Sequence, residues 1–295
     1  MSTESATLMD GRALASQIRE TLKRETEYMM KVGVEPKLAT ILVGEDPASK
    51  VYLGSKHNAA ADVGIKSENF RLPGTATEEE LALLIRRLNS DSAINGILLQ
   101  LPLPAHLDGR KMIEQISPAK DVDGLTSANM GLLMYNQASL MPCTPRGVME
   151  LLHHYKIPIA GSRAVIINRS SLVGKPLFHM LLAEDATVTV CHSKSRNLLS
   201  ITRQADILVS AVGRRPPFIL TREMVKEHVT VVDVAMNRVG GKLVGDADFE
   251  NVSRKASFIT PVPGGVGPMT VVMLMQNTLI AAAKQHDIKE ASVPW

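Results

Sequence analysis

Two side chains with different chemistry, Tyr52 and Lys56, stand four residues apart in the first half of the chain. The pattern of residues 48–61 predicts a helix, which would place both side chains on one face. A phenol ring stacks on flat ligands, and an amine donates or accepts protons. A surface lysine beside a half-buried tyrosine has the same spacing, so the pair alone leaves the function open.

Two further polar side chains, Gln100 and Asp123, follow apolar stretches of the sequence. Gln100 comes directly after a predicted strand at residues 94–99, and ligands of α/β proteins bind at the carboxyl ends of such strands. Asp123 stands before Gly124 in the stretch KDVDGLT, where a carboxylate either binds a ligand or caps a turn. Both residues are candidate ligand contacts, with an ordinary loop role as the alternative.

The C-terminal part contains a glycine- and proline-rich segment, PVPGGVGPMT, at residues 261–270. Proline fixes φ and glycine allows positive φ, so this segment is predicted to form a shaped loop. The apolar run after it predicts a buried helix, whose N-terminal N–H groups can hold a ligand. We expect Gly264, Gly265 and Val266 to wall a ligand site, although a tight structural turn has a similar composition.

A candidate nucleotide site follows a predicted strand at residues 164–167, in the stretch NRSSLVGKPL. A phosphate can bind at the strand-to-helix turn that this stretch predicts. The next predicted strand ends in HSKSR, which lacks the acidic residue that binds the ribose of NAD. Its hydroxyls and cations suit a 2′-phosphate, so NADP is predicted rather than NAD, with a solvated basic turn as the alternative. The candidate cofactor contacts are Asn168, Arg169, Ser170, Gly174, His192 and Ser193.

Predicted strands and helices alternate along most of the chain, which is typical of parallel βαβ units. We predict a two-domain α/β protein with a cleft between the domains. The first domain comprises residues 1–148, carries the catalytic and substrate-binding residues, and is completed by a C-terminal helix at 270–295. The second, at residues 149–269, is a Rossmann-like nucleotide-binding domain. The predicted strands are 38–44, 67–72, 94–99, 164–167, 186–190, 207–211 and 229–234, and the predicted helices include 11–31, 48–61, 78–90, 145–155 and 176–183.

The composition argues against several classes of protein. A net charge of +3, from 33 basic and 30 acidic residues, and 3% aromatic residues disfavour nucleic-acid binding. Cys143 and Cys191 match no metal-ligand spacing, so we expect reduced thiols and no metal site. The polar N-terminus resembles neither a secretory signal nor a transit peptide, which makes the cytoplasm the expected location. The apolar run after Pro268 is interrupted by Gln276 and Asn277 and is expected to fall short of a membrane span.

As an ordered set, these motifs resemble the bifunctional methylenetetrahydrofolate dehydrogenase/cyclohydrolase family. The resemblance covers residues 10–284 and rests on Tyr52-x-x-x-Lys56, LLQLPLP, DVDGLT and PVPGGVGPMT. NRSSLVGKP resembles the family's G-R-S-x-x-V-G-x-P, with Asn168 in place of glycine, and CHS is the family's C-H-S. We expect Asn168 to tolerate a left-handed φ and to add bulk beside the cofactor. DVAMN resembles D-V-G-I-N and makes Met236 an apolar cofactor contact.

The resemblance implies NADP-dependent oxidation of 5,10-methylenetetrahydrofolate to the methenyl compound and its hydrolysis to 10-formyltetrahydrofolate, in one-carbon metabolism and purine biosynthesis. By resemblance, Lys56 is the principal catalytic residue and Gln100 positions it. Tyr52 would stack on the aminobenzoyl ring, and Asp123 would accept hydrogen bonds from the pterin. Gly264, Gly265 and Val266 would lie where pterin and nicotinamide meet, Arg169, Ser170 and Ser193 would hold NADP, and the protein would be a homodimer.

Three alternatives are considered beside this interpretation. Short-chain dehydrogenases also use Tyr-x-x-x-Lys, but they carry it after their nucleotide site, which is the reverse of the order here. A monofunctional dehydrogenase would lack the hydrolytic step, and the retention of Lys56 and Gln100 argues against it. A non-catalytic folate-binding module would have a decayed nucleotide site. Asn168 is the only residue of the sequence that favours this alternative.

Overall fold

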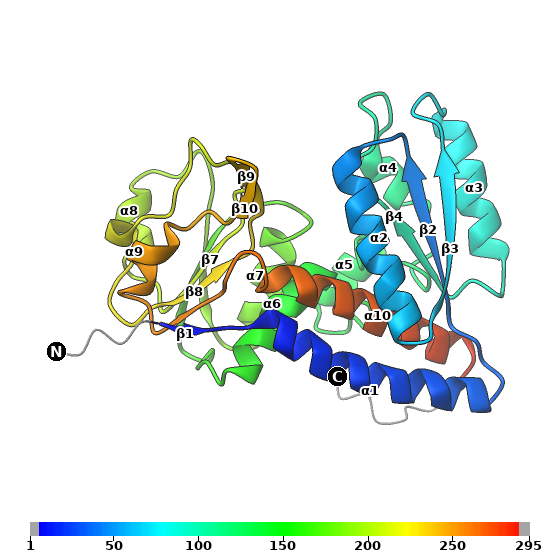
Figure 1. Cartoon of the computed structure of the whole chain (residues 1–295), viewed down its shortest axis with the longest axis horizontal. Coiled ribbons are helices and arrows are strands. Elements are labelled where there is room, and N and C mark those ends of the chain that lie inside the picture. The colour runs from blue at the N-terminus through cyan, green and yellow to red at the C-terminus, as the bar shows by residue number, and fades with distance from the viewer. Residues whose placement is uncertain (1–5, 289–295) are drawn as a thin grey trace. The chain divides into compact units, whose positions relative to one another are not determined.

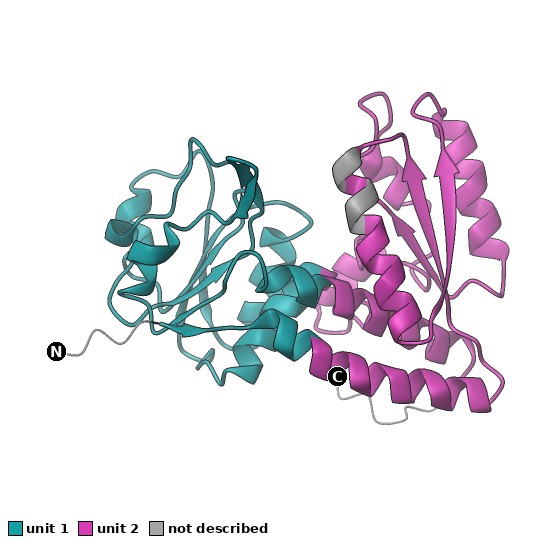
Figure 2. Cartoon of the chain, viewed as in Figure 1, with its two compact units in different colours: residues 1–15, 144–270 teal, residues 16–143, 271–295 magenta. Residues whose placement is uncertain are grey.

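The computed structural model describes residues 6–288, except for the side chains of residues 47, 48 and 50–52 within one helix. The chain forms two compact units (Figure 2). Unit 1 contains Met1–Ala15 and Thr144–Thr270, and unit 2 contains Ser16–Cys143 and Val271–Trp295. The described N-terminal residues thus group with the unit that carries the nucleotide-like segment, whereas the predicted boundary places them in the first domain.

Unit 2 is built around a three-stranded parallel sheet in the order β3-β2-β4 (Figure 1). Its central strand is apolar and almost wholly buried, as expected for a strand with a neighbour on each side. The strands are β2 (Lys37–Val43), β3 (Lys66–Leu72) and β4 (Gly96–Leu99). The helices that lie in this unit are α2 (Pro47–Asp62), α3 (Glu78–Ser90), α4 (Gly109–Ile113) and α5 (Ser127–Met134). Two longer helices contain residues of both units, α1 (Gly11–Lys31) and α10 (Val266–Gln285).

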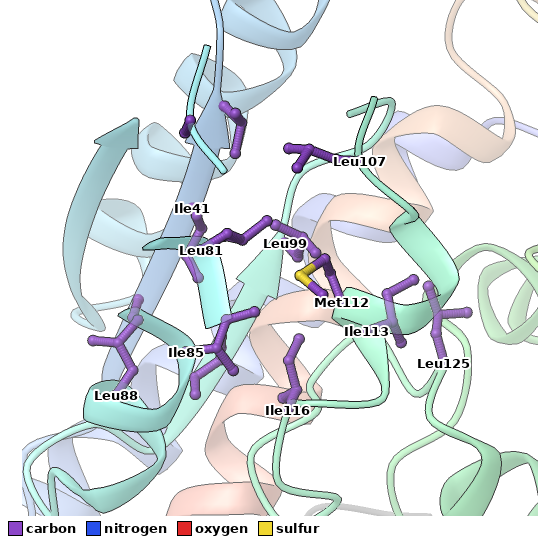
Figure 3. Close-up of a cluster of buried hydrophobic side chains, with 14 of the residues drawn as sticks. Ile41, Leu81, Ile85, Leu88, Leu99, Leu107, Met112, Ile113, Ile116 and Leu125 are labelled. Atoms are coloured by element: carbon purple, nitrogen blue, oxygen red, sulfur yellow. The ribbon is translucent and has the colours of Figure 1, made fainter. Parts of the chain in front are cut away.

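A dense apolar cluster fixes the position of the unit 2 sheet (Figure 3). Helix α3 contributes Leu81, Ile85 and Leu88, whose spacing of three and four residues is that of one buried helix face. The helix starts at a capping box, in which the Thr77 hydroxyl accepts from Glu80 N at 3.2 Å and the Glu80 carboxylate accepts from Thr77 N at 2.7 Å. The side chains of α3 therefore pack on the sheet in one register.

Unit 1 contains a six-stranded parallel sheet in the order β1-β11-β8-β7-β5-β6. The chain runs from β5 to β6 on one side and then returns to β7 on the other, so the strand order reverses at β5. The strands are β1 (Thr7–Leu8), β5 (Arg163–Ile167), β6 (Thr187–Cys191), β7 (Ile207–Ser210), β8 (Thr230–Asp233) and β11 (Phe258–Ile259). This reversal is the place where doubly wound sheets bind ligands.

The other elements of unit 1 surround this sheet. The helices are α6 (Cys143–His154), whose first residue belongs to unit 2, α7 (Gly174–Ala183), α8 (Leu198–Thr202) and α9 (Phe249–Ser253), with a 3-10 turn at Arg222–Met224. An antiparallel hairpin is formed by β9 (Asn237–Val239) and β10 (Lys242–Val244). The N-terminal strand β1 pairs in parallel with β11, Thr7 opposite Phe258, which explains why these N-terminal residues group with unit 1.

Helix α10 is long and apolar enough to cross a membrane by length and composition, so the expectation that this run falls short was wrong on those grounds. The interruption at Gln276 and Asn277 is not large enough to lower its mean hydropathy below that of a span. Most of the helix is nevertheless buried inside the protein, 72% of the apolar window. Burial of this kind is that of a core helix in a folded protein.

Candidate active site

Lys56 and Gln100 contact each other at the carboxyl edge of the unit 2 sheet. Lys56 Nζ donates to Gln100 Oε1 at 2.9 Å. The amide is oriented by its own neighbour, since Gln100 Nε2 donates to Leu101 O at 2.7 Å. Its backbone is anchored as well, because Gln100 N donates to Ile41 O of the central strand at 2.9 Å. The glutamine therefore presents its oxygen, and only its oxygen, to the lysine.

Asp123 lies close enough to Lys56 for the ammonium charge to act on the pKa of the Asp123 carboxyl. Burial raises the pKa of the Asp123 carboxyl above its ordinary value, and the nearby Asp121 carboxylate also raises it. The Lys56 ammonium and a hydrogen bond from Cys143 act in the opposite direction and lower that pKa. A carboxylate with raised pKa beside a lysine is typical of a functional site in a ligand pocket. Unit 2 thus brings together Lys56, Gln100 and Asp123.

The turn that carries Asp123 is held by buried polar groups that sequence reasoning did not single out. Asp121 is 1% exposed, and its Oδ2 accepts from Thr126 N at 2.8 Å and from Asn129 Nδ2 at 2.9 Å. Gly124 has a φ of 68°, a conformation that side chains with a Cβ rarely adopt. Asp121 and Gly124 determine the path of the backbone on both sides of Asp123.

Tyr52 lies on helix α2, one turn before Lys56, as the spacing predicted. Its side chain is outside the described residues, so its predicted contact with a folate ring stays a prediction. The helix itself begins at a clear cap, where Asp46 Oδ2 accepts from Ser49 N at 2.7 Å.

The glycine- and proline-rich segment forms a tight loop in unit 1 that leads into α10. Gly264 has a φ of 118°, and Gly265 N donates to Pro261 O at 2.8 Å. A Cβ on Gly265 would lie 2.7 Å from both Pro261 O and Thr260 Cβ, so glycine is required there by close packing. Gly264, Gly265 and Val266 are all buried, and their contact with a ligand stays a prediction.

The start of α1 packs on this same loop. Arg12 N donates to Gly264 O at 3.1 Å, and a Cβ on Gly11 would lie 1.9 Å from Gly265 O. Gly11 and Gly265 therefore approach each other backbone to backbone. The loop at residues 261–270 is thus shaped in part by Gly11 and the backbone of Arg12, contacts that the motif alone does not reveal.

Asn168 closes the turn between β5 and α7 with its own side chain. Its Oδ1 accepts from Ser170 N at 2.7 Å and from Gly174 N at 3.1 Å. Its Nδ2 donates to Ala211 O, just after β7, at 2.6 Å. Asn168 does not have a left-handed φ, so that part of the expectation was wrong, and its amide is directed into the turn. The side chain joins the ends of β5 and β7, where the strand order reverses.

Arg169 and Ser193 leave the sheet from neighbouring strands. Ile167, the last residue of β5, pairs with Cys191, the last residue of β6, so the segments after these residues start side by side. Arg169 and Ser193 are exposed, and within the described part of the chain the Arg169 guanidinium makes no hydrogen bond or ion pair. His192 is partly buried and shapes its turn, since its Nδ1 accepts from Lys194 N at 3.1 Å. An exposed guanidinium beside hydroxyls fits the 2′-phosphate of NADP.

The DVAMN segment contains a buried carboxylate that sequence reasoning missed. Asp233 Oδ2 accepts from Ala247 N at 2.7 Å, and burial, with a smaller contribution from the nearby Asp246, raises the pKa of Asp233 to about 6. Asp246 is fully buried and accepts from Ser210 Oγ at 2.7 Å and from Asn237 Nδ2 at 3.2 Å. The two acids thus fix the backbone around Met236, whose side chain is 39% exposed.

The described part of the chain was compared with the expectations of no metal site and of reduced cysteines. Residues 6–288 contain no group of three or more His, Cys, Asp or Glu side chains that could hold a metal ion. Cys143 and Cys191 are both buried and form no disulfide.

Comparison with known proteins gives matches over nearly the whole chain. The family model described as tetrahydrofolate dehydrogenase/cyclohydrolase, catalytic domain, matches residues 9–123, and its NAD(P)-binding domain matches residues 142–286. The bifunctional protein FolD of Cenarchaeum symbiosum is 52% identical over 275 residues, which is 93% of this chain and 98% of that protein.

Solved structures give the same result. The bifunctional enzyme FolD from Campylobacter jejuni, a methylenetetrahydrofolate dehydrogenase/cyclohydrolase, is 48% identical with a TM-score of 0.92, over 95% of this chain and 99% of that one. The Trypanosoma brucei enzyme, solved with NADP cofactor and inhibitor, is 38% identical with a TM-score of 0.91, over 95% of this chain and 98% of that one. The chain therefore belongs to the tetrahydrofolate dehydrogenase/cyclohydrolase family.

Proposed function

We propose that this protein oxidises 5,10-methylenetetrahydrofolate with NADP and hydrolyses the methenyl product to 10-formyltetrahydrofolate. Family membership over nearly the full length supports both activities, as does the NADP-complexed relative. The observation that carries the assignment to this chain's own residues is the contact between Lys56 and Gln100, with Asp123 close enough to respond to the lysine's charge.

In the first step, the methylene carbon between N5 and N10 of the folate loses a hydride and becomes the methenyl cation. NADP supplies the acceptor for that hydride when bound. The residues proposed to hold it are Arg169, Ser170 and Ser193, with Asn168 and Gly174 shaping the turn between them. The protein's contribution to this step is orientation of the two reactants, which accounts for a large part of the rate when reacting atoms are held in contact.

In the second step, water adds to the methenyl carbon and loses one proton, which gives a carbinol. The bond from that carbon to N5 then breaks as N5 takes up this proton, and the hydroxyl proton is released to solvent as the formyl C=O forms. We propose that Lys56 carries the proton between the water and N5, since an amine can both accept and donate. Gln100 holds the amine through its oriented oxygen. Asp123, as a carboxylate, would accept hydrogen bonds from the ring N–H and the exocyclic amine of the pterin. Tyr52 would stack on the aminobenzoyl ring.

The alternative functions receive less support. A monofunctional dehydrogenase has no need of an amine held by an oriented amide, so the geometry around Lys56 favours the two-step reaction. The argument for a non-catalytic module was that the bulk of Asn168 would weaken cofactor binding at the nucleotide turn. The Asn168 amide makes three hydrogen bonds to backbone groups of this turn and its neighbour. The side chain therefore supports the turn, and the argument for a non-catalytic module no longer holds.

The test of this function is the variant Lys56→Met, measured in two separate assays. Conversion of the methenyl compound to the formyl compound should be lost, because the proton carrier is gone, while NADP reduction with methylenetetrahydrofolate partly survives. Lys66→Met is a matched control, since Lys66 is an exposed lysine at the start of β3 that pairs with Glu35 at 2.6 Å. Normal hydrolysis in folded Lys56→Met would refute the role of Lys56, and an inactive wild type in both assays would refute the function.

We also propose that the protein is a cytoplasmic homodimer that supplies formyl groups to purine biosynthesis. The proposal of a dimer rests on the resemblance of the sequence to its family. Light scattering coupled to size-exclusion chromatography measures the mass directly, and a monomer at micromolar concentration would refute the dimer.

A further inference from the structure

Asn277 is a fully buried amide in the long apolar helix α10. Its relative exposure is 0%, and its neighbours along α10 are mostly methionine, leucine, valine and alanine. Burying an amide costs free energy unless its N–H groups are hydrogen-bonded. Asn277 Nδ2 donates to Val122 O at 2.8 Å and to Met141 O at 2.8 Å. The amide therefore joins two backbone segments far apart in the sequence.

Asn277 joins the residue before Asp123 to a second segment that packs against the residue after Asp123. Val122 directly precedes Asp123, and Met141 lies in the segment against which Gly124 packs. A Cβ on Gly124 would be only 2.6 Å from the carbonyl carbon of Met141. With a φ of 68° at Gly124, the turn cannot shift without losing this packing. One side chain from α10 thus fixes the backbone before and after the carboxylate.

Cys143 extends this network to the Asp123 side chain itself. Its Sγ donates to Val122 O at 3.3 Å, and Asn277 Nδ2 lies 3.6 Å from the same sulfur. The same S–H group is near the Asp123 carboxylate, and when it donates there instead it lowers the pKa of that group. Asn277, Cys143 and Asp123 therefore form a continuous chain of polar contacts, all within unit 2.

We propose that Asn277 is a positioning residue for folate binding, which holds the Asp123 carboxylate in place through Val122, Met141 and Cys143. This inference rests on the proposed function, in which Asp123 binds the pterin. Asn277 makes no contact with folate in this scheme, and its effect on folate affinity passes through Asp123.

A double-mutant cycle separates this role from general support of the fold. The affinity for tetrahydrofolate is measured by isothermal titration calorimetry for wild type, Asn277→Ala, Asp123→Ala and the double variant, and NADP affinity is measured in parallel. Asn277→Ala should weaken tetrahydrofolate binding about tenfold, the effect of misplacing one strong hydrogen-bonding group, with NADP binding unchanged. In the Asp123→Ala background, the same change should cost nothing further.

Thr278→Val is the matched control. Thr278 is the next residue on α10, is equally buried, and spends its hydroxyl on Leu274 O of its own helix at 2.8 Å. This variant should leave tetrahydrofolate affinity unchanged. If Asn277→Ala does not fold, Asn277→Ser keeps a donor in a smaller side chain and replaces it in the cycle.

The outcomes distinguish this inference from the proposed function. The positioning role would be overturned if the losses of tetrahydrofolate affinity in Asn277→Ala and Asp123→Ala add up in the double variant. It would also be overturned if Asn277→Ala weakens NADP binding as much as tetrahydrofolate binding. Failure of wild type to bind tetrahydrofolate, or full affinity in Asp123→Ala, would instead overturn the proposed function. A loss confined to tetrahydrofolate and absent in the Asp123→Ala background supports the inference.

Discussion

The buried Asp233 makes a quantitative prediction about stability and pH. Its pKa is raised to about 6 in the folded protein, against 3.8 for an ordinary aspartate, because burial disfavours the charged form. Between these two values the folded state keeps a proton that the unfolded state has lost. Stability therefore falls as pH rises through this window, by about 1.4 kcal/mol per pH unit, and the loss is complete above the folded pKa. Over the whole window the loss is about 3 kcal/mol.

The variant Asp233→Asn removes this titration while keeping an oxygen that can accept from Ala247 N. We expect the free energy of unfolding of wild type to fall by about 2.4 kcal/mol relative to Asp233→Asn between pH 4 and pH 7, because part of the loss has already occurred at pH 4. Urea unfolding of both proteins at each pH, followed by circular dichroism, gives the difference and cancels the titrations that the two share. The absolute stability of the variant does not enter this comparison.

Asp206→Asn is the control with the opposite sign. Asp206 is paired with Lys226, whose hydrogen bond lowers the pKa of the aspartate, so its contribution is lost only as pH falls below the ordinary range. Its difference from wild type should be flat between pH 4 and pH 7. A flat difference for Asp233→Asn as well, or a stability that rises with pH relative to it, would refute the raised pKa of Asp233.

The nucleotide turn gives two further predictions. Arg169→Ala should weaken NADP binding by about 1.5 to 3 kcal/mol, roughly ten- to a hundredfold, because a charge-assisted contact to the 2′-phosphate is lost. NAD lacks that phosphate, so dissociation constants for both cofactors decide the matter, and an unchanged preference would place the phosphate elsewhere. Asn168→Gly should lower the free energy of unfolding by about 1 to 3 kcal/mol in the absence of NADP, since the backbone partners of the amide lose their bonds. Denaturant unfolding tests this, and unchanged stability would mean that the turn does not depend on the asparagine.

Most of the secondary structure could be predicted from the sequence because its apolar periodicity is strong. Helix 11–31 and helix 78–90 coincide with α1 and α3, and the predicted strands differ from β2 to β8 by one or two residues at their ends. The short elements β1, β11 and the β9–β10 hairpin were not predicted. A strand of two residues, such as Thr7–Leu8, carries no periodicity, and it exists only because β11 is beside it.

The site was predictable where function depends on the identity of one side chain in a motif. Lys56, Gln100 and Asp123 are of this kind, and the structure brings them together. Residues that act through tertiary contacts were not predictable. Asn277 was noticed only as an interruption of an apolar run, and its partners Val122 and Met141 are backbone carbonyls with no sequence signal. Asn168 differs from the motif in the sequence, but the direction of its amide depends on Ala211, which follows another strand, β7.

The pairing of β1 with β11 and the place of α10 constrain how this protein matures on the ribosome. Strand β1 is made before the other described elements of its unit, but its partner Phe258–Ile259 is made after all the other strands of the same sheet. Unit 2 is also incomplete until α10 is made, because Asn277 and the other core residues of this helix follow the other elements of unit 1 in the chain. Neither unit has all its described elements until α10 has left the ribosomal exit tunnel, so the partly made chain exposes apolar surface until then. Nascent chains of this protein are therefore expected to depend on chaperones that cover such surface.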